Sequence, residues 1–313
     1  MAADTGRGCG INPSMQTRPY AVLQAPSTLG LEAGGVEGLG DRLLELGLAR
    51  DIHARFAGRL AVPPKQAQPD PDIGVLNAES IAAWSPKLAD AVEAMFDAGE
   101  FPVVLGGDCT IVLGSMLACR RRGRYGLLFI DGNADFFQPE AEPHGEGASM
   151  DLAFVTGHGP RLLTDIEGLG PIVRAEDVVA FAYRDHDDQK EYGSQPLPAE
   201  LKAIDLPAVR KLGIEVAARE AVAHLTRPEL DGFFIHVDAD CLDDAVMPAV
   251  DFRLPGGLSL EELATALRIA LRSGHAVGLE VAIYNPSLDA DGSAGRALAS
   301  VLTQALHAAA SSA

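Results

Sequence analysis

The sequence predicts an α/β fold in three layers, α/β/α, around a mainly parallel sheet of about eight strands. Short apolar runs bounded by Gly or Asp alternate along the chain with amphipathic segments of helical period. With 313 residues and a hydrophobic fraction of 47%, the chain can also bury one large core. We therefore expect a loose segment at residues 1–19, followed by a single domain over residues 20–313.

The expected elements follow one another in a regular order. Residues 1–19 mix Gly, Pro, Ser and Thr without periodicity, and residues 61–74 contain four prolines, which is typical of a long surface loop. Apolar runs predict strands at residues 20–24, 101–105, 126–130, 177–183, 232–237 and 275–283. Periodic segments predict helices at residues 36–49, 80–98, 110–121, 198–203, 214–223, 259–273 and 293–309. This alternation indicates parallel pairing with helices on both faces of the sheet.

Charge and hydropathy narrow the classes of partner. The formal net charge is −19, and no basic run is longer than the three arginines at residues 120–122, which argues against nucleic acid and anionic lipid. No apolar stretch is long enough to span a bilayer, and the N-terminus lacks the apolar core of a signal peptide. We expect a cytoplasmic protein that acts on a small molecule, without nucleic acid or membrane partners.

Acidic residues gather directly after the predicted strands. Asp131, Asn133 and Asp135 follow one strand at a spacing of two, and Asp238 and Asp240 follow another. In an extended segment this spacing points side chains to one side, and parallel strands end at one edge of the sheet. Crowded carboxylates repel one another unless cations neutralise them. The pattern therefore predicts a metal site; the alternative is a solvated acidic rim.

Short motifs in a fixed order resemble those of the arginase-like ureohydrolase superfamily, which includes arginases, agmatinases and formiminoglutamases. The segment Leu105-Gly-Gly-Asp-Cys109 resembles the GGDH motif, and Asp131-Gly-Asn-Ala-Asp135 resembles the DAHxD motif. Residues 238–243 resemble DxDxxDP, and residues 255–258 and 285–288 match the late motifs. The likeness covers roughly residues 20 to 310, and it implies the arginase-like fold.

The resemblance also implies a binuclear metal site and a reaction. The usual metal of the superfamily is Mn²⁺, with Zn²⁺, Fe²⁺ and Ni²⁺ as alternatives, and the reaction is hydrolysis of a guanidinium C–N bond by water that two ions activate. Asp240 or a bridging carboxylate would accept protons. Homo-oligomers are usual among its members. Carried over by position, the ligands of the first ion are Cys109, Asp131, Asp135 and Asp238, and those of the second are Asp131, Asn133, Asp238 and Asp240.

Two ligand positions depart from the usual motifs. Cys109 stands in place of His, as in a branch linked to hydroxyguanidine substrates, and it is interpreted either as a thiolate ligand or as a small apolar residue at a helix start. Asn133 also stands in place of His, and its amide oxygen is a weaker ligand for a transition metal. We therefore expect the second ion to be lost or labile and the activity to be impaired.

The substrate positions depart further. Ile283 aligns with the acid that clamps the guanidinium in the family. Glu280, three residues upstream, is a candidate substrate contact, although it sits on the opposite face of an ideal strand and could replace the clamp only through a bulge. His144 is a candidate for the catalytic proton shuttle, since Ala148 occupies the family position; surface exposure is its alternative. His236 either contacts a ligand carboxylate or is a core residue. Asp187 is a candidate contact to an α-amino group, and its alternative role is to cap a helix. Further candidate substrate contacts, for which the alternative is an ordinary solvated charge in a loop, are Asp151, Asp251 and Arg253.

These features predict a metal-dependent hydrolase that cleaves a C–N bond in an amidine- or guanidine-like group, such as an N-hydroxyguanidine, of an amino-acid-derived substrate. An amide hydrolase would fit the missing clamp. The alternative from another class is a metal-depleted pseudoenzyme with a binding or structural role. Asn133 and Ile283 favour the pseudoenzyme, whereas the retained carboxylates favour the hydrolase.

Overall fold

The central sheet has eight strands, all parallel, in the order β2-β1-β3-β8-β7-β4-β5-β6. The structure is a computed structural model, and it describes residues 18–310. The predicted fold class is thereby confirmed, while the loose segment predicted at residues 1–19 lies outside the described residues except for its last two. The strands are β1 (Tyr20–Gln24), β2 (Arg55–Arg59), β3 (Phe101–Leu105), β4 (Tyr125–Ile130), β5 (Val178–Phe181), β6 (Lys202–Ile204), β7 (Gly232–Asp238) and β8 (Ala276–Ala282).

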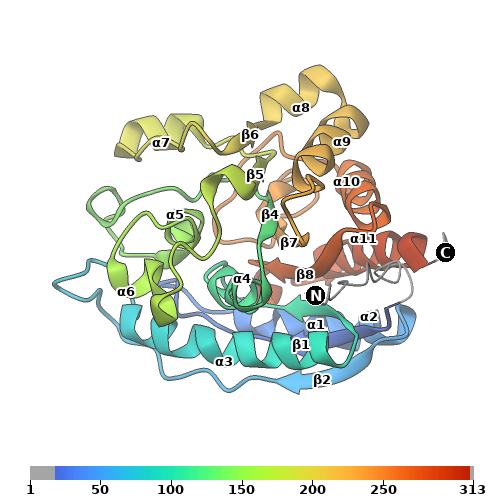
Figure 1. The fold of residues 1–313 in the computed structure, drawn as a ribbon, viewed down its shortest axis with the longest axis horizontal. Coiled ribbons are helices and arrows are strands. Elements are labelled where there is room, and N and C mark those ends of the chain that lie inside the picture. Colours follow the sequence, from blue (N-terminus) through green and yellow to red (C-terminus); the bar gives the residue numbers. More distant parts are fainter. Residues whose placement is uncertain (1–17, 311–313) are drawn as a thin grey trace, which may run out of the picture.

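Helices cover the sheet in two groups (Figure 1). One group packs around α3 and α4, with α3 against β3 and α4 against β4, β7 and β8, and it includes α5 and α6. The other joins α9 and α10 to α11, with α1 and α2 against α11 and α8 against α9. The helices are α1 (Leu39–Glu45), α2 (Leu48–Asp51), α3 (Ala78–Asp97), α4 (Ile111–Arg122), α5 (Asp151–Val155), α6 (Arg161–Thr164), α7 (His186–Tyr192), α8 (Leu206–Leu212), α9 (Ile214–Leu225), α10 (Leu260–Arg272) and α11 (Ser293–Ala310).

The predicted elements differ from the structure at the edges of the sheet and in several helices, since α5, α6, α7 and α8 were not predicted. The edge strands β2 and β6 were not predicted, and the expected helix at residues 198–203 is wrong, because β6 begins at Lys202. Both edge strands are short and partly exposed, so neither has the apolar run of a buried strand. The helix expected at residues 36–49 is broken at Gly47, whose φ of 95° cannot continue a right-handed helix.

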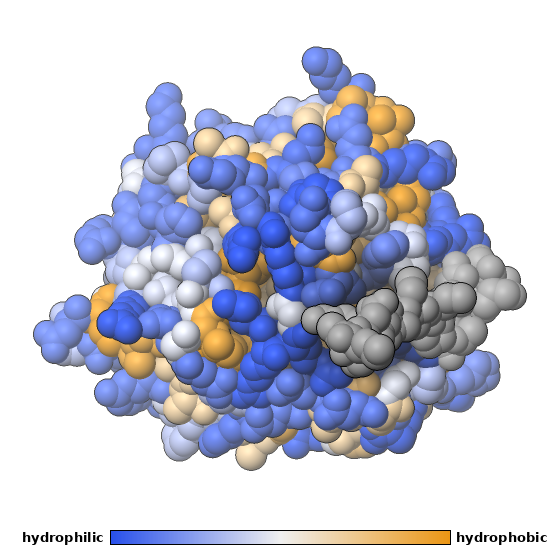
Figure 2. Space-filling view, in the orientation of Figure 1, coloured by the Kyte–Doolittle hydropathy of each residue, from blue (hydrophilic) through white to orange (hydrophobic). Residues whose placement is uncertain are grey.

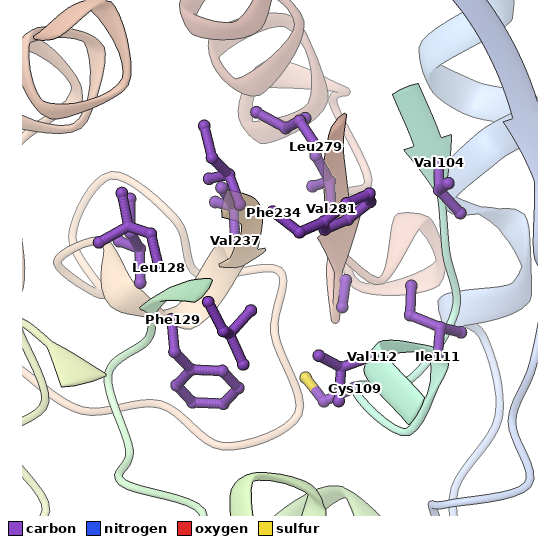
Figure 3. Packing of buried hydrophobic residues seen from close by; sticks show 14 of the residues in the cluster. Val104, Cys109, Ile111, Val112, Leu128, Phe129, Phe234, Val237, Leu279 and Val281 are labelled. Carbon is purple, nitrogen blue, oxygen red and sulfur yellow. The ribbon is translucent and has the colours of Figure 1, made fainter. Parts of the chain in front are cut away.

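Burial is complete in the middle of the sheet. Every residue of β3, β7 and β8 is buried, as a parallel strand covered on both faces requires. Figure 3 shows part of this apolar cluster, including Phe129, Val237 and Val281 of the strands β4, β7 and β8. The thiol of Cys109 belongs to the same cluster. The candidate site therefore rests on a closely packed base.

The surface agrees with the acidic composition. The face of the molecule in Figure 2 is mostly hydrophilic, with separate small apolar areas. Among residues 18–310, no helix has the length and apolar character needed to cross a bilayer.

Candidate metal centre and substrate cleft

The predicted ligands meet because their strands are neighbours. β3, β8, β7 and β4 lie side by side in the sheet, so the segments that follow them leave the same edge. The segment after β3 carries Cys109, that after β8 carries Ile283, and the segments after β7 and β4 carry the period-two acids. This is the crevice position at which parallel α/β sheets place their working residues.

The turn between β3 and α4 is shaped to present Cys109. Gly107 touches the segment after β1 so closely that a Cβ atom there would lie 1.8 Å from the Ser27 carbonyl oxygen. Asp108 fixes the same contact, since its carboxylate accepts hydrogen bonds from Ser27 Oγ at 2.7 Å and from the Thr110 N–H at 2.9 Å. Asp108 is therefore a structural acid. The turn directs Cys109 Sγ to donate to Asp238 Oδ2 at 2.8 Å.

The acids after β4 and β7 are held by matching backbone contacts. Asp131 Oδ1 accepts from the Asn133 N–H at 2.7 Å, and Asp238 Oδ1 accepts from the Asp240 N–H at 2.6 Å. The second oxygen of Asp238 accepts from Cys109 Sγ, whereas the second oxygen of Asp131 has no hydrogen-bond partner among the described residues. Asp135 has a φ of +44°, and such a left-handed conformation in a residue other than glycine is often found at a functional site.

Several buried polar atoms of this cluster have no hydrogen-bond partner among the described residues. They are Asp131 Oδ2, both carboxylate oxygens of Asp151 and His236 Nε2. A buried polar atom without a partner costs roughly 1–3 kcal/mol. A divalent cation would satisfy these atoms, and two sets of side chains have ligand atoms within 4.8 Å of one another: Cys109, Asp131, His236 and Asp238, and Cys109, Asp135 and Asp151. The residues present therefore fit a metal ion.

The electrostatics of the cluster lead to the same conclusion. Burial, followed by the charges of neighbouring acids, raises the pKa of Asp131 and of Asp238 well above the usual carboxyl value. Burial likewise raises the pKa of Asp135 and Asp151. Burial and then the charge of Asp238 raise the pKa of the Cys109 thiol. The metal-free cluster thus favours protonation, and a cation is the natural partner of its ionised form.

The family's second metal position looks different. Asp240 Oδ1 accepts from the Gly132 N–H at 3.0 Å, and Asp240 Oδ2 accepts from Asn133 Nδ2 at 2.7 Å. Both oxygens of this carboxylate are therefore satisfied without a cation. The neutral amide of Asn133 thus donates to Asp240 at the position where the family has a second imidazole ligand.

A cleft opens directly above the cluster. It has a volume of about 590 Å³, and its floor is formed by Asn133, Asp135, Asp238 and Asp240. No Lys or Arg lines it among the described residues. Its eight acids are Glu32, Asp135, Glu142, Glu146, Asp188, Asp238, Asp240 and Asp251. A cleft of one sign attracts ligands of the opposite charge, so this cleft favours cations.

Three positions that the sequence singled out line the cleft: a predicted substrate contact, the proton-shuttle candidate and the position of the missing clamp. Asp251 lines it and accepts from Asn285 Nδ2 at 3.0 Å. His144 lines its mouth, exposed, with Nδ1 3.3 Å from Glu32 Oε2. Ile283 lines it where the family acid was expected, with a φ of 69° that is unusual for a β-branched residue.

Other predicted contacts require correction. Glu280 is fully buried within β8, and its carboxylate is hydrogen-bonded to His236 and Ser115. It therefore cannot touch substrate. Arg253 is exposed and forms an ion pair with Asp244 at 3.1 Å, outside the cleft. Asp151 is fully buried with the metal-binding candidates instead of lining a substrate loop.

Asp187, the predicted contact to an α-amino group, does not line the cleft, but its neighbour does. Asp187 is exposed on α7, whereas Asp188 lines the cleft, because neighbouring residues of a helix point in directions about 100° apart. The rim acids Glu32, Glu142 and Glu146 were missed altogether. Their only signal in the sequence is acidity within loops, which is indistinguishable there from a solvated surface.

The raised carboxyl pKa values predict a distinctive pH dependence of the metal-free protein. An acid whose pKa is higher in the folded state stabilises it at pH below the unfolded-state pKa, about 4, and this stability is lost as pH rises through the folded-state pKa. We expect the melting temperature of chelator-treated protein to fall as the pH rises above about 4, and Mn²⁺ at neutral pH to restore it by several degrees.

Variants separate this effect from the titration of other groups. Asp151→Asn removes one crowded acid, so its metal-free melting temperature should depend less on pH than that of the wild type. Asp72→Asn, at an exposed loop position, serves as the control and should follow the wild type. Identical pH profiles for all three proteins would contradict repulsion within the cluster.

Comparisons with known proteins agree with this geometry. The chain is 28% identical over 288 residues to the arginase of Staphylococcus aureus (strain COL), covering 88% of this chain and 93% of that protein. It is 29% identical to the arginase of Bacillus caldovelox, covering 91% and 88% of the two chains.

Solved structures share the fold. The native structure of Bacillus caldovelox arginase has a TM-score of 0.80 at 25% identity and covers 95% of this chain and 99% of its own. Formimidoylglutamase from Bacillus subtilis has a TM-score of 0.71 at 18% identity, covering 93% and 87%, which shows the fold alone. The sequence profile of the Arginase family matches residues 33–308, and the chain therefore belongs to the arginase family.

Proposed function

We propose that this protein is a metal-dependent hydrolase that cleaves a C–N bond in an amidine- or guanidine-like group. The observation that carries the proposal is a cluster of buried carboxylates beside the thiol of Cys109. Unpartnered oxygens of this cluster lie on Asp131 and Asp151, and its members Asp135 and Asp238 line a cleft large enough for a small molecule. Membership of a family of C–N hydrolases supports it. The cytoplasmic location and homo-oligomeric state remain predictions.

The first ion would be held by Cys109, Asp131, Asp135 and Asp238, with Mn²⁺ as the proposed metal and Zn²⁺, Fe²⁺ or Ni²⁺ as alternatives. Asn133 and Asp240 would complete a second, weaker position. When bound, divalent ions of this kind supply a nucleophile from water at neutral pH and stabilise negative charge as it develops.

Residues of the chain supply the proton transfers. Asp240 lies on the cleft floor with its carboxylate oriented by Gly132 and Asn133, so it can take a proton and return it to the departing nitrogen. His144 stands at the mouth in contact with Glu32, where an imidazole can pass protons between the cleft and solvent.

The part of the cleft lined by Glu32, Glu142, Glu146 and Asp188 and the part lined by Ile283 favour different chemical groups of a substrate. The rim acids attract a cationic amine, and Asp188 is the proposed contact in place of Asp187. Ile283 lies beside the β3–α4 turn, with its N–H donating to the Gly107 carbonyl at 2.8 Å. An aliphatic wall there forfeits the charge-assisted hydrogen bond of the family acid, so we propose a weakly basic reacting group, such as an N-hydroxyguanidine or a formimidoyl group.

A pseudoenzyme is the second candidate, and one observation favours it. The hydrogen bond between Asn133 and Asp240 satisfies the second metal position internally, so binuclear chemistry could be absent. This candidate predicts metal binding at the first position without turnover. It is thus separated from the hydrolase by activity and not by metal content.

The test is a substrate panel with Mn²⁺-loaded protein, followed by release of urea, ammonia or amine. It should contain N-hydroxyguanidino and formimidoyl compounds, each with either a free amine or a carboxylate at the far end. We expect turnover of the amine-bearing compounds and a kcat/KM at least about tenfold higher than that of their carboxylate partners, equivalent to about 1.4 kcal/mol.

Two controls make the panel decisive. Added salt should reduce the preference for cations, because exposed rim charges are screened. The double variant Glu142→Gln, Glu146→Gln should reduce it further while leaving metal content unchanged. Metal-loaded protein that hydrolyses none of the compounds would favour the pseudoenzyme.

A further inference from the structure

His236 lies on β7, at the bottom of the acidic cluster. Its side chain is fully buried and stacks on Phe129, with ring centroids 4.6 Å apart and an angle of 8° between the planes. Strand period places it on the same side as Asp238, two residues later. Packing therefore holds the imidazole in one plane, with one edge directed toward the cluster.

The other edge of the ring is fixed by a buried carboxylate. His236 Nδ1 lies 2.8 Å from Glu280 Oε1, and Ser115 Oγ donates to Glu280 Oε2, so both oxygens of Glu280 are used as acceptors. All three side chains are buried. With the Nδ1–H donating to this carboxylate, a neutral imidazole carries its lone pair on Nε2.

The Nε2 atom has no partner among the described residues. It lies 4.0 Å from Asp131 Oδ2, which is also unpartnered, and this separation is too long for a hydrogen bond. Two ligands of one ion, each about 2.0–2.2 Å from it, can be up to about 4.2 Å apart. The gap between the two orphaned atoms is therefore of the size that a shared cation spans.

We propose that His236 Nε2 is a ligand of the first metal ion, together with Cys109, Asp131 and Asp238, and that Glu280 orients it. The inference rests on the proposed metal site and deepens it. It adds an imidazole to a set that has lost the histidines expected at positions 109 and 133. A carboxylate bonded to the far nitrogen of a metal-binding histidine is the usual way in which proteins orient such a ligand.

The proposal also changes the metal preference. A donor set of thiolate, imidazole and carboxylate is softer than carboxylates alone, so it favours Zn²⁺ or Fe²⁺ over Mn²⁺ more strongly than the acidic residues suggest. Glu280 is thereby a positioning residue, and this role explains why an acid is buried within β8.

The experiment uses pulsed EPR on the full chain loaded with Mn²⁺ alone and with ¹⁵N-labelled histidine. We expect a hyperfine coupling from a directly bound imidazole nitrogen, which shifts between ¹⁴N and ¹⁵N protein. The other proposed ligands bind through oxygen or sulfur, so the coupling would identify a histidine. His144→Gln is the control, because His144 is the other histidine beside the cleft, and it should leave the coupling unchanged.

The variant His236→Gln should abolish the coupling and weaken Mn²⁺ binding at least about tenfold. If this variant does not fold, the spectrum of the labelled wild type still decides. Bound Mn²⁺ without an imidazole coupling would overturn the role of His236 and leave the proposed function standing. Absence of binding of Mn²⁺, Zn²⁺, Fe²⁺ and Ni²⁺ alike would overturn both.

Discussion

Replacing Asp238 by Asn should abolish metal binding and hydrolysis, and it should stabilise the metal-free fold. Asp238 belongs to both proposed metal positions, so loss of its charge should weaken binding by more than about 100-fold, beyond the effect of altering a residue that only orients a ligand. Asn can still accept from the Asp240 N–H, so the local backbone is retained. In the metal-free protein, burial and the neighbouring acids raise the pKa of Asp238, which means that its ionised form is unfavourable there. The variant removes this unfavourable charge.

The two effects have opposite signs, which makes the measurement specific. Elemental analysis should show metal in the wild type and none in the variant, while the melting temperature in chelator should be higher for the variant. Asp244→Asn is the matched control, since Asp244 lies after the same strand and pairs with Arg253 outside the cluster. Equal metal content in the wild type and in Asp238→Asn would exclude this cluster as the metal centre.

The buried part of the sheet could be predicted because strands covered on both faces have nearly continuous apolar sequences. The bounds predicted for β1 and β3 match the structure, those for β4 and β7 differ by one residue at one end, and those for β8 differ by one residue at each end. The edge strands could not be predicted in this way. Arg55–Arg59 carries a charge at each end and a Gly within, so its place in the sheet comes from pairing with β1 and not from an apolar pattern.

The site shows the same division between strands and loops. The position of the acids after β4 and β7 was enough to predict that they meet, because parallel strands end at one edge of the sheet. The extended geometry expected for them is wrong, since Asp240 lies in a 3₁₀ helix over Ala239–Cys241 and Asp135 has a left-handed φ of 44°. The loops were harder. Asp151 begins α5 at the end of a long irregular segment, and only the fold shows that its carboxylate turns inward to Cys109 and Asp135.

Some properties depend on neighbours that are distant in sequence. Glu280 and His236 are 44 residues apart, and their contact exists because β7 and β8 pair with these two residues in register. The sequence alone cannot state this register. It left His236 with two interpretations and placed Glu280 among the substrate contacts, whereas the paired strands place both beneath the cluster.

Replacing Ile283 by Glu should shift the substrate preference toward plain guanidines such as L-arginine and agmatine. A carboxylate at this position would restore a charge-assisted hydrogen bond to the guanidinium, worth roughly 1.5–3 kcal/mol, or at least about a tenfold rise in kcat/KM for guanidines relative to N-hydroxyguanidines. The change also removes a β-branched side chain from a φ of 69°, which should offset part of the cost of placing another acid in the cleft.

The comparison needs a variant with the same shape and no charge. Ile283→Gln should improve guanidine turnover less than Ile283→Glu, because a neutral amide oxygen accepts a weaker hydrogen bond from a cation. The ratio of kcat/KM values between the two substrate classes is the quantity to measure, since it cancels differences in metal loading. Wild-type turnover of arginine on the order of 10 s⁻¹ would show instead that another acid, with Asp251 the nearest candidate in the cleft, already binds the guanidinium.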